Sequence, residues 1–229
     1  MAATPYTDGT YLRQNPAWHA EDAPWKARHV ASFIDELRPQ TLCDVGCGAG
    51  RVLDILCERY GADGVGYDPS PDAIALAREL ERPGLRFAVG QPEPGERYDA
   101  ALLLDVLEHT ENPFELLRNV RTLADQFVLH FPLDLSAQAV LRGRFERARA
   151  ELGHLHYFSA ETALALLRDC DFRIERCSYL ASTLENRGES FASKLANVPR
   201  WFLWRVSPTL MSRTLGGATL LVHATPAVR

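Results

Sequence analysis

Short apolar runs alternate along the chain with segments in which apolar residues recur every three or four positions. The runs predict buried strands, and the three-to-four spacing predicts helices with one apolar face. Strands are expected at 42–45, 64–68, 85–89, 99–104, 127–131, 172–179 and 218–224, and helices at 27–37, 52–60, 71–80, 113–123 and 159–170. This alternation predicts an α/β fold, a Rossmann-like, doubly wound, mostly parallel sheet with helices on both faces.

Local signals mark the ends of two predicted helices. Pro39 is expected to end the first one, because a proline cannot continue the helical hydrogen-bond pattern. Ser159 and Thr162 resemble part of a capping box at the start of the last one. In parallel sheets, ligands bind at the carboxyl ends of the strands. The segments to inspect for a site are therefore 44–50, 68–70, 90–91, 105–109 and 130–136.

A glycine-rich loop follows the first predicted strand. Gly46, Gly48 and Gly50 come directly after Asp44, and a helix is predicted to begin after the loop. Such a loop lets the backbone approach a ligand, and the helix directs its positive end toward the same point. A dinucleotide fingerprint would place its third glycine at position 51, where this chain has Arg51, and no Lys-Ser or Lys-Thr pair follows as in a P-loop.

The second predicted strand ends in an acid. Asp68 lies 24 residues after Asp44, in the stretch GVGYDPS. A carboxylate there can accept hydrogen bonds from both hydroxyls of a ribose and disfavours a 2′-phosphate. Each half of this pattern is weak alone, and Asp68 alone is typical of a strand-end turn. Together, in a strand–turn–helix context, they predict an adenosyl ligand.

With these motifs the sequence resembles the class I S-adenosylmethionine (SAM)-dependent methyltransferases, over roughly residues 40–180. The resemblance is closest to a bacterial small-molecule group with D-V-G-C-G-x-G and L-E-H motifs. It rests on DVGCGAG (44–50), YDPS (67–70), YDAALLLDVLEHTENP (98–113) and GHLHYFS (153–159). It implies a seven-stranded sheet whose last strand, 218–224, is antiparallel. The implied cofactor is SAM, with S-adenosylhomocysteine (SAH) as product.

The resemblance also implies roles for individual residues. Asp44 would face the methionine end of SAM, Asp68 would hold the ribose, and Pro69 would border the adenine. Relatives often carry Gly-Asp after the third strand, and this chain departs from them with Gln91, whose carbonyl can accept the same hydrogen bond. The full set of expected cofactor contacts is Asp44, Gly46, Cys47, Gly48, Gly50, Asp68, Pro69, Gln91, Asp105, Val106 and Leu107.

Methyl transfer to a hydroxyl or an amine also requires loss of a proton, which a histidine or carboxylate can accept. The candidates are His109, His130, His154, His156 and Asp134. His154 is the preferred catalytic residue, followed by His109, which with Glu108 belongs to the L-E-H motif and could instead brace the loop. His130 lies inside an apolar strand and is expected to be a core residue. The H-x-H pair alone is weak evidence for a metal, and no metal site is expected.

Two segments fall outside the motifs. Residues 1–38 are expected to form a lid or cap before a SAM-binding domain at 39–229. The aromatic and histidine residues of segment 1–38 could line the acceptor pocket or could fasten the segment to the sheet edge. With one later histidine, the expected substrate contacts are Tyr11, Trp18, His19, Trp25 and His156.

The second segment, about 184–213, is an expected helical insertion that is basic in an acidic protein. Its arginines and aromatic residues fit an interfacial helix on anionic lipid, a dimer face or an anionic-substrate pocket. They also fit a helix that packs on the sheet edge while its arginines extend to water.

Composition changes this picture little. The 229 residues, 46% hydrophobic and 24% charged, suit one well-buried domain. The chain has no apolar run of membrane-spanning length and no signal-peptide pattern at its N-terminus, so a cytoplasmic protein is expected. The net charge of −5 argues against broad binding to nucleic acid. Cysteines are expected as small buried apolar residues at Cys43, Cys47, Cys57, Cys170 and Cys177.

The sequence therefore favours an enzyme that methylates an O or N atom of a small molecule, such as a natural product, a sugar or a lipid-like acceptor. The strand end LLLDVLEH lacks the N-P-P-Y type of motif that binds base amines, so nucleic acid is not expected as a partner. A non-catalytic SAM-binding module is the alternative, and a nicotinamide-dependent oxidoreductase is disfavoured by the glycine spacing. A homodimer and membrane contact through 184–213 remain open.

Overall fold

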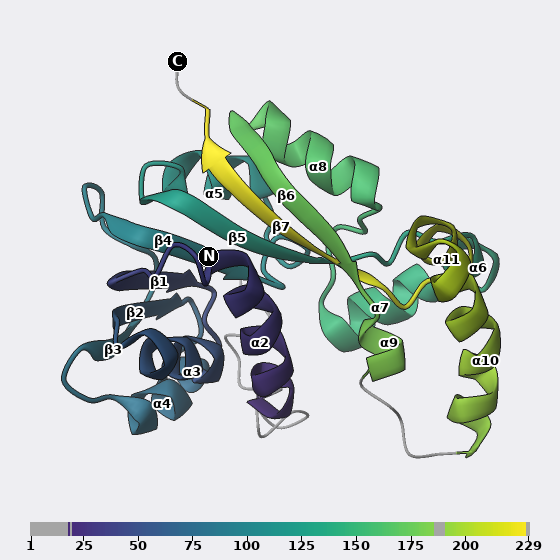
Figure 1. Cartoon of the computed structure of the whole chain (residues 1–229), viewed down its shortest axis with the longest axis horizontal. Coiled ribbons are helices and arrows are strands. Elements are labelled where there is room, and N and C mark those ends of the chain that lie inside the picture. Colours follow the sequence, from purple (N-terminus) through teal and green to yellow (C-terminus); the bar gives the residue numbers. More distant parts are fainter. Residues whose placement is uncertain (1–17, 19, 186–190, 228–229) are drawn as a thin grey trace.

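A seven-stranded sheet forms the centre of the molecule (Figure 1). The structure is a computed structural model that describes residues 18, 20–185 and 191–227. The strand order is β3-β2-β1-β4-β5-β7-β6. The strands are β1 (Thr41–Val45), β2 (Asp63–Asp68), β3 (Leu85–Val89), β4 (Tyr98–Leu104), β5 (Ala124–Pro132), β6 (Phe172–Leu180) and β7 (Thr219–Pro226). The predicted Rossmann-like fold class is confirmed.

Strand directions decide which strand ends meet. Strands β1 to β5 pair in parallel, whereas β7 runs antiparallel to both β5 and β6. The antiparallel last strand is thus confirmed. As a result, the carboxyl ends of β1, β2, β4, β5 and β6 and the start of β7 lie along one edge of the sheet. This carboxyl edge gathers the segments that follow the strands.

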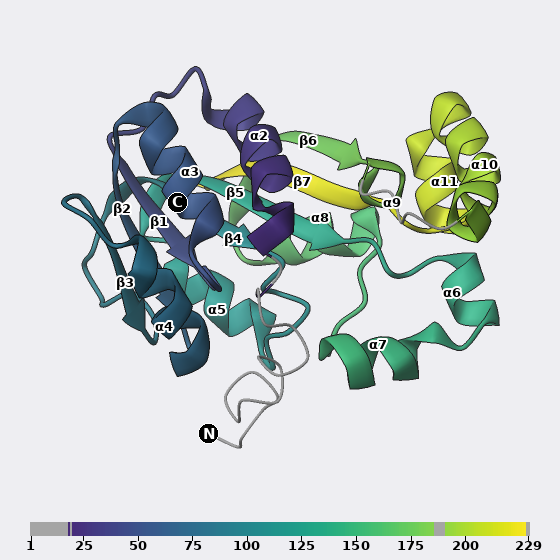
Figure 2. The same cartoon turned by 90° about the horizontal axis from the view of Figure 1, so that it is seen from below.

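Helices cover both faces of the sheet (Figure 2). One core joins the sheet to α2 (Ala23–Ile34), α3 (Arg51–Tyr60) and α4 (Pro71–Ala77), and the other joins it to α5 (Pro113–Val120) and α8 (Ala160–Asp169). Strand β4 shows the alternation that serves both, since Leu102 packs in the first core and Leu103 in the second. Burial on both faces explains why its sequence is continuously apolar.

The helix starts follow capping chemistry. Ser159 accepts a hydrogen bond from the Thr162 backbone N–H, and the Thr162 hydroxyl accepts one from the Ser159 N–H. The capping box that the sequence showed only in part is therefore complete at α8. Asn112 caps α5 in a related way by accepting from the Glu115 N–H.

Several boundaries differ from the prediction. Helix α2 ends at Ile34, before Pro39, and Arg38 adopts a positive φ of 47° in the connecting turn. The predicted helix 71–80 finishes as a 3-10 turn at Arg78–Leu80. Two helices were not predicted, α6 (Ala137–Leu141) and α7 (Arg144–Leu152). The first is too short for a periodic signal, and the second buries no residue and so lacks an apolar face.

The segment between β6 and β7 is helical, as predicted for 184–213. It forms α9 (Ser182–Glu185), α10 (Phe191–Val206) and α11 (Pro208–Thr214). No helix within the described parts of the chain is long and apolar enough to cross a membrane.

The expectation for the cysteines holds for three of the five. Cys43, Cys57 and Cys170 are buried and Cys47 is half-buried, all as free thiols. The prediction is wrong for Cys177, which is exposed on β6. Strand β6 lies at one edge of the sheet. Its position at the edge is set by the sheet topology, so the sequence alone did not reveal that the Cys177 side chain faces water.

Substitution Ser159→Ala tests the capping box. We expect the free energy of unfolding to fall by about 1 kcal/mol, because the first turn of α8 loses an acceptor for its N–H groups. Urea unfolding followed by circular dichroism measures the change. Thr122→Ala, at an exposed position after α5, is the control and should change stability by less than about 0.5 kcal/mol. Equal effects of the two substitutions would refute the capping role.

Candidate functional site

The glycine loop turns tightly between β1 and α3 at the carboxyl edge. Gly46 and Gly48 have positive φ angles of 80° and 54°, which L side chains rarely adopt. The backbone N–H groups of Gly46 and Cys47 donate to the Tyr67 carbonyl oxygen at 2.7 and 3.0 Å, which ties the loop to β2. A Cβ at Gly46 would lie 2.5 Å from a Val106 methyl carbon. Only glycine therefore fits between the loop and the segment after β4.

Asp68 organises the other side of this loop. One carboxylate oxygen accepts from the Gly48 N–H at 2.9 Å, and the other accepts from the Ser70 N–H at 2.8 Å. Burial raises the pKa of Asp68, while these two N–H groups oppose the rise. Each oxygen keeps a second lone-pair direction, so the carboxylate can bind two further hydroxyl donors.

Asp44 lies beneath the loop with an unsatisfied oxygen. It is 2% exposed, and its Oδ1 atom has no hydrogen-bond partner among the described residues. Burial and the nearby Asp68 raise the pKa of Asp44 to about 7, against an opposing effect of Lys26. A buried acceptor without a partner is costly, so this position is suited to a ligand that brings a hydrogen-bond donor or a positive charge.

The segment after β4 begins with a strained and firmly held acid. Asp105 has a φ of 57°, and its two oxygens contact Lys26 Nζ at 2.7 Å and His130 Nδ1 at 2.6 Å. Burial opposes ionisation, but His130 and Lys26 together hold the pKa of Asp105 below its ordinary value. His130 also bonds the Thr219 hydroxyl at 2.8 Å through Nε2. The prediction that His130 is a satisfied core residue agrees with these contacts.

The remaining predicted cofactor residues occupy different surroundings. Val106 covers the glycine loop, whereas the Leu107 side chain is 1% exposed within the core, so a ligand could reach only its backbone. A Cβ at Gly50 would lie 2.5 Å from Phe87, which shows a packing reason for this glycine. The other side chains are half-buried or exposed around the loop, at Cys47, Pro69 and Gln91. Contact of these residues with a cofactor stays a prediction.

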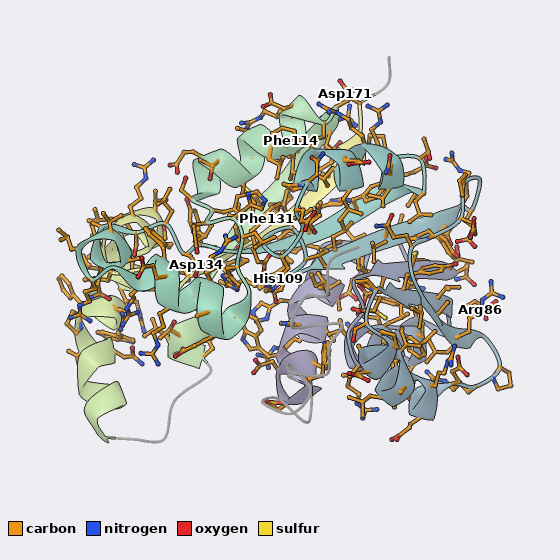
Figure 3. All side chains as sticks on the ribbon, turned by 180° about the vertical axis from the view of Figure 1, so that it is seen from behind. Arg86, His109, Phe114, Phe131, Asp134 and Asp171 are labelled. Atoms are coloured by element: carbon orange, nitrogen blue, oxygen red, sulfur yellow. The ribbon has the colours of Figure 1, made fainter. Side chains whose placement is uncertain are left out.

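A second polar cluster lies next to the first and comprises Glu108, His109, Asp134 and His154. His154 is buried and its Nδ1 contacts Asp134 Oδ2 at 2.6 Å. The His109 and His154 rings meet edge to face, with centroids 4.8 Å apart. The sequence separation between these residues is large, yet His109 and Asp134 lie close together beside α7 (Figure 3).

Backbone contacts join this cluster to the end of β4. The Glu108 carbonyl oxygen accepts from the N–H groups of Leu155 at 2.6 Å and His156 at 3.1 Å. His156 also contacts the Thr110 carbonyl oxygen at 3.0 Å through Nε2. The H-x-H segment is thus hydrogen-bonded along the L-E-H segment, and both the backbone and the side chain of His156 help to hold it there.

Two members of the cluster are shifted toward their neutral forms. Burial, with Asp105 nearby, raises the pKa of Glu108 well above its ordinary value, and both its carboxylate oxygens have no hydrogen-bond partner among the described residues. Burial and the adjacent His154 lower the pKa of His109 to about 4. Glu108, His109 and His154 could in principle hold a metal ion, since one ligand atom from each lies within 4.8 Å of the others.

The two tryptophans of the N-terminal segment have different surroundings. The Trp18 ring lies over the loop, 2.9 Å from where a Cβ of Gly48 would be. Trp25 instead donates through Nε1 to Glu185 at 2.6 Å, and its ring meets the His29 ring at a tilted angle with centroids 4.6 Å apart, which favours the fastening role over a pocket wall. Tyr11 and His19 lie outside the described residues.

Lys26 is the site residue that sequence reasoning missed. It lies on α2, its side chain is 22% exposed, and it forms the ion pair with Asp105 across 79 positions of sequence. Nothing in the local pattern distinguishes it from the other basic residues of α2. Only the packing of α2 on the sheet brings it to the carboxyl edge.

The chain is similar to known methyltransferases. Residues 18–176 match the family described as "Methyltransferase domain". Over 97 residues, 39% of this chain, it is 35% identical to the ubiquinone biosynthesis O-methyltransferase of Azorhizobium caulinodans, of which the match covers 38%. Over 168 residues, 67% of this chain, it is 28% identical to a tRNA U34 carboxymethyltransferase of Shewanella frigidimarina, of which the match covers 50%. The chain thus spans half or less of these relatives.

A solved structure shares the fold. The magnesium protoporphyrin IX methyltransferase of Synechocystis, crystallised with bound SAH, superposes with a TM-score of 0.59 at 18% identity. The alignment covers 92% of this chain and 84% of that one. At this identity the likeness shows the fold and no more.

Asp44→Asn tests the cost of the buried carboxylate. Between its ordinary value of 3.8 and about 7, the folded protein binds a proton at Asp44 that the unfolded chain has released. Stability therefore falls as the pH rises through this window. Because the amide cannot ionise, we expect the variant to be more stable at pH 8, by about 2 to 4 kcal/mol, and unchanged near pH 4.

Chemical denaturation of the ligand-free protein at the two pH values measures this difference. Glu58→Gln, at an exposed position of α3, is the matched control and should show no pH-dependent gain. A gain of the same size at pH 4 and pH 8 would show that ionisation of Asp44 is not its cause.

Proposed function

The chain belongs to the methyltransferase domain family, with the fold of the class I SAM-dependent enzymes, and we propose that it transfers a methyl group from SAM to an O or N atom of a small molecule. The observation that carries the proposal is that two sets of residues lie at one edge of the sheet. One is the cradle of Asp44, Gly46, Gly48 and Asp68, and the other is the His154–Asp134 pair. The segment 105–109 lies between them, since Val106 covers the loop and Glu108 binds the histidine segment.

Three features of the cradle support the proposal that it binds SAM. The close approach of Val106 and Trp18 to the glycine loop leaves room for backbone and not for side chains. Asp68 is fixed by two backbone N–H groups and has lone pairs left for the ribose hydroxyls. The unpartnered oxygen of Asp44 supports a role as acceptor for the positively charged amino-acid end, directly or through water.

When bound, SAM supplies an electrophilic methyl carbon on a sulfonium sulfur. The residues of this chain have to align the acceptor with that carbon and exclude water, because the displacement requires the nucleophile, methyl and sulfur in line. Trp18 over the glycine loop supports a lid role for the part of residues 1–38 that precedes α2, whereas α2 itself belongs to the buried core.

His154 is the proposed general base. Its Nδ1 is hydrogen-bonded to Asp134, and this bond orients the ring. Nε2 is then left to take the proton of a hydroxyl or amine acceptor. The negative Asp134 would stabilise the imidazolium that forms. His109 packs against the His154 ring and, in its neutral form, would orient the acceptor without adding a second positive charge.

The acceptor is proposed to be a small molecule, such as a natural product, a sugar or a lipid-like compound. The net charge of −5 and the LLLDVLEH strand end support this over a nucleic acid, although the relatives include several tRNA U34 carboxymethyltransferases. The alternative is a module that binds SAM without turnover. The buried His154–Asp134 pair favours an enzyme, because a binding module has no use for an oriented base.

Transfer of a labelled methyl group would test the function directly. The protein is incubated with SAM labelled at the methyl group and with cell extract divided into small polar, lipid, glycan and macromolecular pools. Label in a small-molecule or lipid pool supports the proposal, and label confined to RNA would overturn the acceptor class. Absence of label in every pool, together with tight SAH binding, would support the non-catalytic module.

Asp68→Ala is expected to weaken SAH binding by about 10- to 100-fold, because the ribose loses two charge-assisted hydrogen bonds. Calorimetric titration gives the affinity, and circular dichroism checks that the fold is kept. Asp72→Ala, in the first turn of α4, is the control with unchanged affinity expected. Unchanged SAH affinity in a folded Asp68→Ala protein would disprove the ribose assignment.

His154→Asn is expected to lower kcat by about 10²- to 10⁴-fold while SAH affinity stays within twofold, because a general base acts on the acceptor and not on the cofactor. His223→Asn, which removes a histidine bonded to Gln126 away from the cluster, is the control. A parallel loss of SAH affinity would indicate that His154 shapes the fold of the site.

The same assay with a chelator separates the base from a metal site. With His154 as base, treatment with EDTA should leave the rate unchanged. Loss of activity that a divalent cation restores would instead assign Glu108, His109 and His154 to a metal. It would overturn the proposed base.

A further inference from the structure

Helix α10 presents an apolar stripe to the solvent. Val198, Trp201, Phe202 and Val206 are 58%, 52%, 62% and 63% exposed. Their spacing of three and four positions places them on one face of the helix. Helices of globular proteins usually turn such a stripe toward the core. Here it faces outward, which calls for a partner.

The outward direction of this stripe is fixed by anchors on the inner face. Leu203 and Trp204 pack against the core of the sheet. Arg200 is partly buried and donates to the Gly216 and Leu215 carbonyl oxygens at 3.3 and 3.2 Å, and to the Gln138 side chain at 2.9 Å. The prediction of a helix packed on the sheet edge therefore describes the inner face only. The outer face remains exposed because the inner face already supplies the core contacts.

Neighbouring helices extend the exposed surface. Helix α11 adds Leu210, which is 44% exposed, and α6 adds Val140 and Leu141, which are 56% and 86% exposed. These helices lie together at one end of the molecule in both views (Figures 1 and 2). We call the exposed apolar residues of α6, α10 and α11 the apolar end surface. Its members are Val140, Leu141, Val198, Trp201, Phe202, Val206 and Leu210.

The charge around this surface is positive in an otherwise acidic protein. Residues 191–216 contain one lysine, three arginines and no acidic residue, whereas the whole chain has a net charge of −5. Arg213 pairs with Glu161 and Arg200 faces inward, so Arg205 is the arginine available to a partner. The Arg205 guanidinium stacks on the Trp201 ring at 4.9 Å, so a cation and an aromatic side chain share the same face. Arginine beside exposed Trp and Phe is typical of helices that lie in the interface of an anionic membrane.

The composition of the stripe distinguishes a bilayer from nucleic acid. Aromatic rings and arginines would suit either, but Val198, Val206 and Leu210 offer no ring for a base to stack on. A hydrocarbon–headgroup boundary accepts all of these side chains. The absence of a spanning helix from the described residues is compatible with a helix that lies in the interface plane.

Topology places this surface at the carboxyl edge of the sheet. Helix α6 follows β5, and α10 and α11 connect the end of β6 to the start of β7. All three strand ends lie at the edge that also carries Asp44 and His154. Contact through the apolar end surface would bring that edge near whatever is contacted.

We propose that the apolar end surface docks on an anionic lipid bilayer, with α10 lying in the plane of the headgroups and Trp201 and Phe202 inserted at the boundary with the acyl chains. Arg205 provides attraction to the lipid phosphates. Docking needs neither methyl donor nor acceptor, so its failure would leave the proposed function unaffected.

Sedimentation of the full chain with vesicles tests the proposal. One set of vesicles is pure phosphatidylcholine, and the other contains about 30% phosphatidylglycerol. We expect binding to the anionic vesicles to be at least tenfold tighter and to weaken in high salt. Trp201→Ser with Phe202→Ser should reduce it at least tenfold. Phe114→Ser, at an aromatic residue 39% exposed on α5, is the matched control and should bind like the unchanged protein.

A charge variant and two further measurements complete the test. Arg205→Gln should weaken binding to the anionic vesicles about fivefold and leave binding to phosphatidylcholine unchanged. Circular dichroism and SAH affinity verify that each variant is folded. Equal vesicle binding by the double variant would overturn the proposal. Absence of vesicle binding by the unchanged protein would overturn it as well. A dimer in light scattering, or tRNA binding, that is lost in the double variant would then identify the partner of this surface.

Discussion

The contact of Asp105 with the Lys26 ammonium and the His130 ring is the interaction on which the rest of the site depends. It holds a residue with a φ of 57° at the point where β4 ends, and so sets the direction of the segment that follows. That segment covers the glycine loop with Val106 on one side and binds the histidine segment through the Glu108 carbonyl on the other. Three distant parts of the chain, α2, the end of β4 and β5, supply these contacts. The positions of the glycine loop and of the histidine segment therefore follow from the packing of the whole domain on one sheet.

The site contains buried acids that the fold alone does not satisfy. Asp44 and Glu108 are 2% and 1% exposed and have side-chain oxygens without hydrogen-bond partners among the described residues. Burial raises the pKa of both carboxyl groups. Their ionised forms therefore lower the stability of the ligand-free protein at neutral pH. Such groups are found where function requires them at the expense of stability. In this chain both lie next to the carboxyl edge, and none of the secondary-structure elements needs them for its own formation.

The carboxyl edge carries both the proposed chemistry and the proposed membrane contact for one topological reason. In a parallel sheet the carboxyl ends of the strands share an edge, and the antiparallel β7 brings its amino end to the same place. Insertions after β5 and between β6 and β7 therefore emerge at the same edge as the glycine loop, toward the β6 end of the sheet. An acceptor that is lipid-like would meet the site from the surface on which α10 lies. Soluble acceptors would need no such arrangement, so the two proposals support each other without depending on each other.

The sequence by itself determined the seven strands, the helices that pack on the two faces of the sheet, the glycine loop, the acid at Asp68 and the capping residue Ser159. These features depend on periodicity or on residues a few positions apart, and local physics decides them. Only the tertiary structure decided that Lys26 reaches Asp105, that His154 pairs with Asp134, and that the apolar stripe of α10 faces outward. Periodicity shows that a helix has an apolar face but not what covers it, and pairing between distant side chains is set by the packing of the elements that carry them.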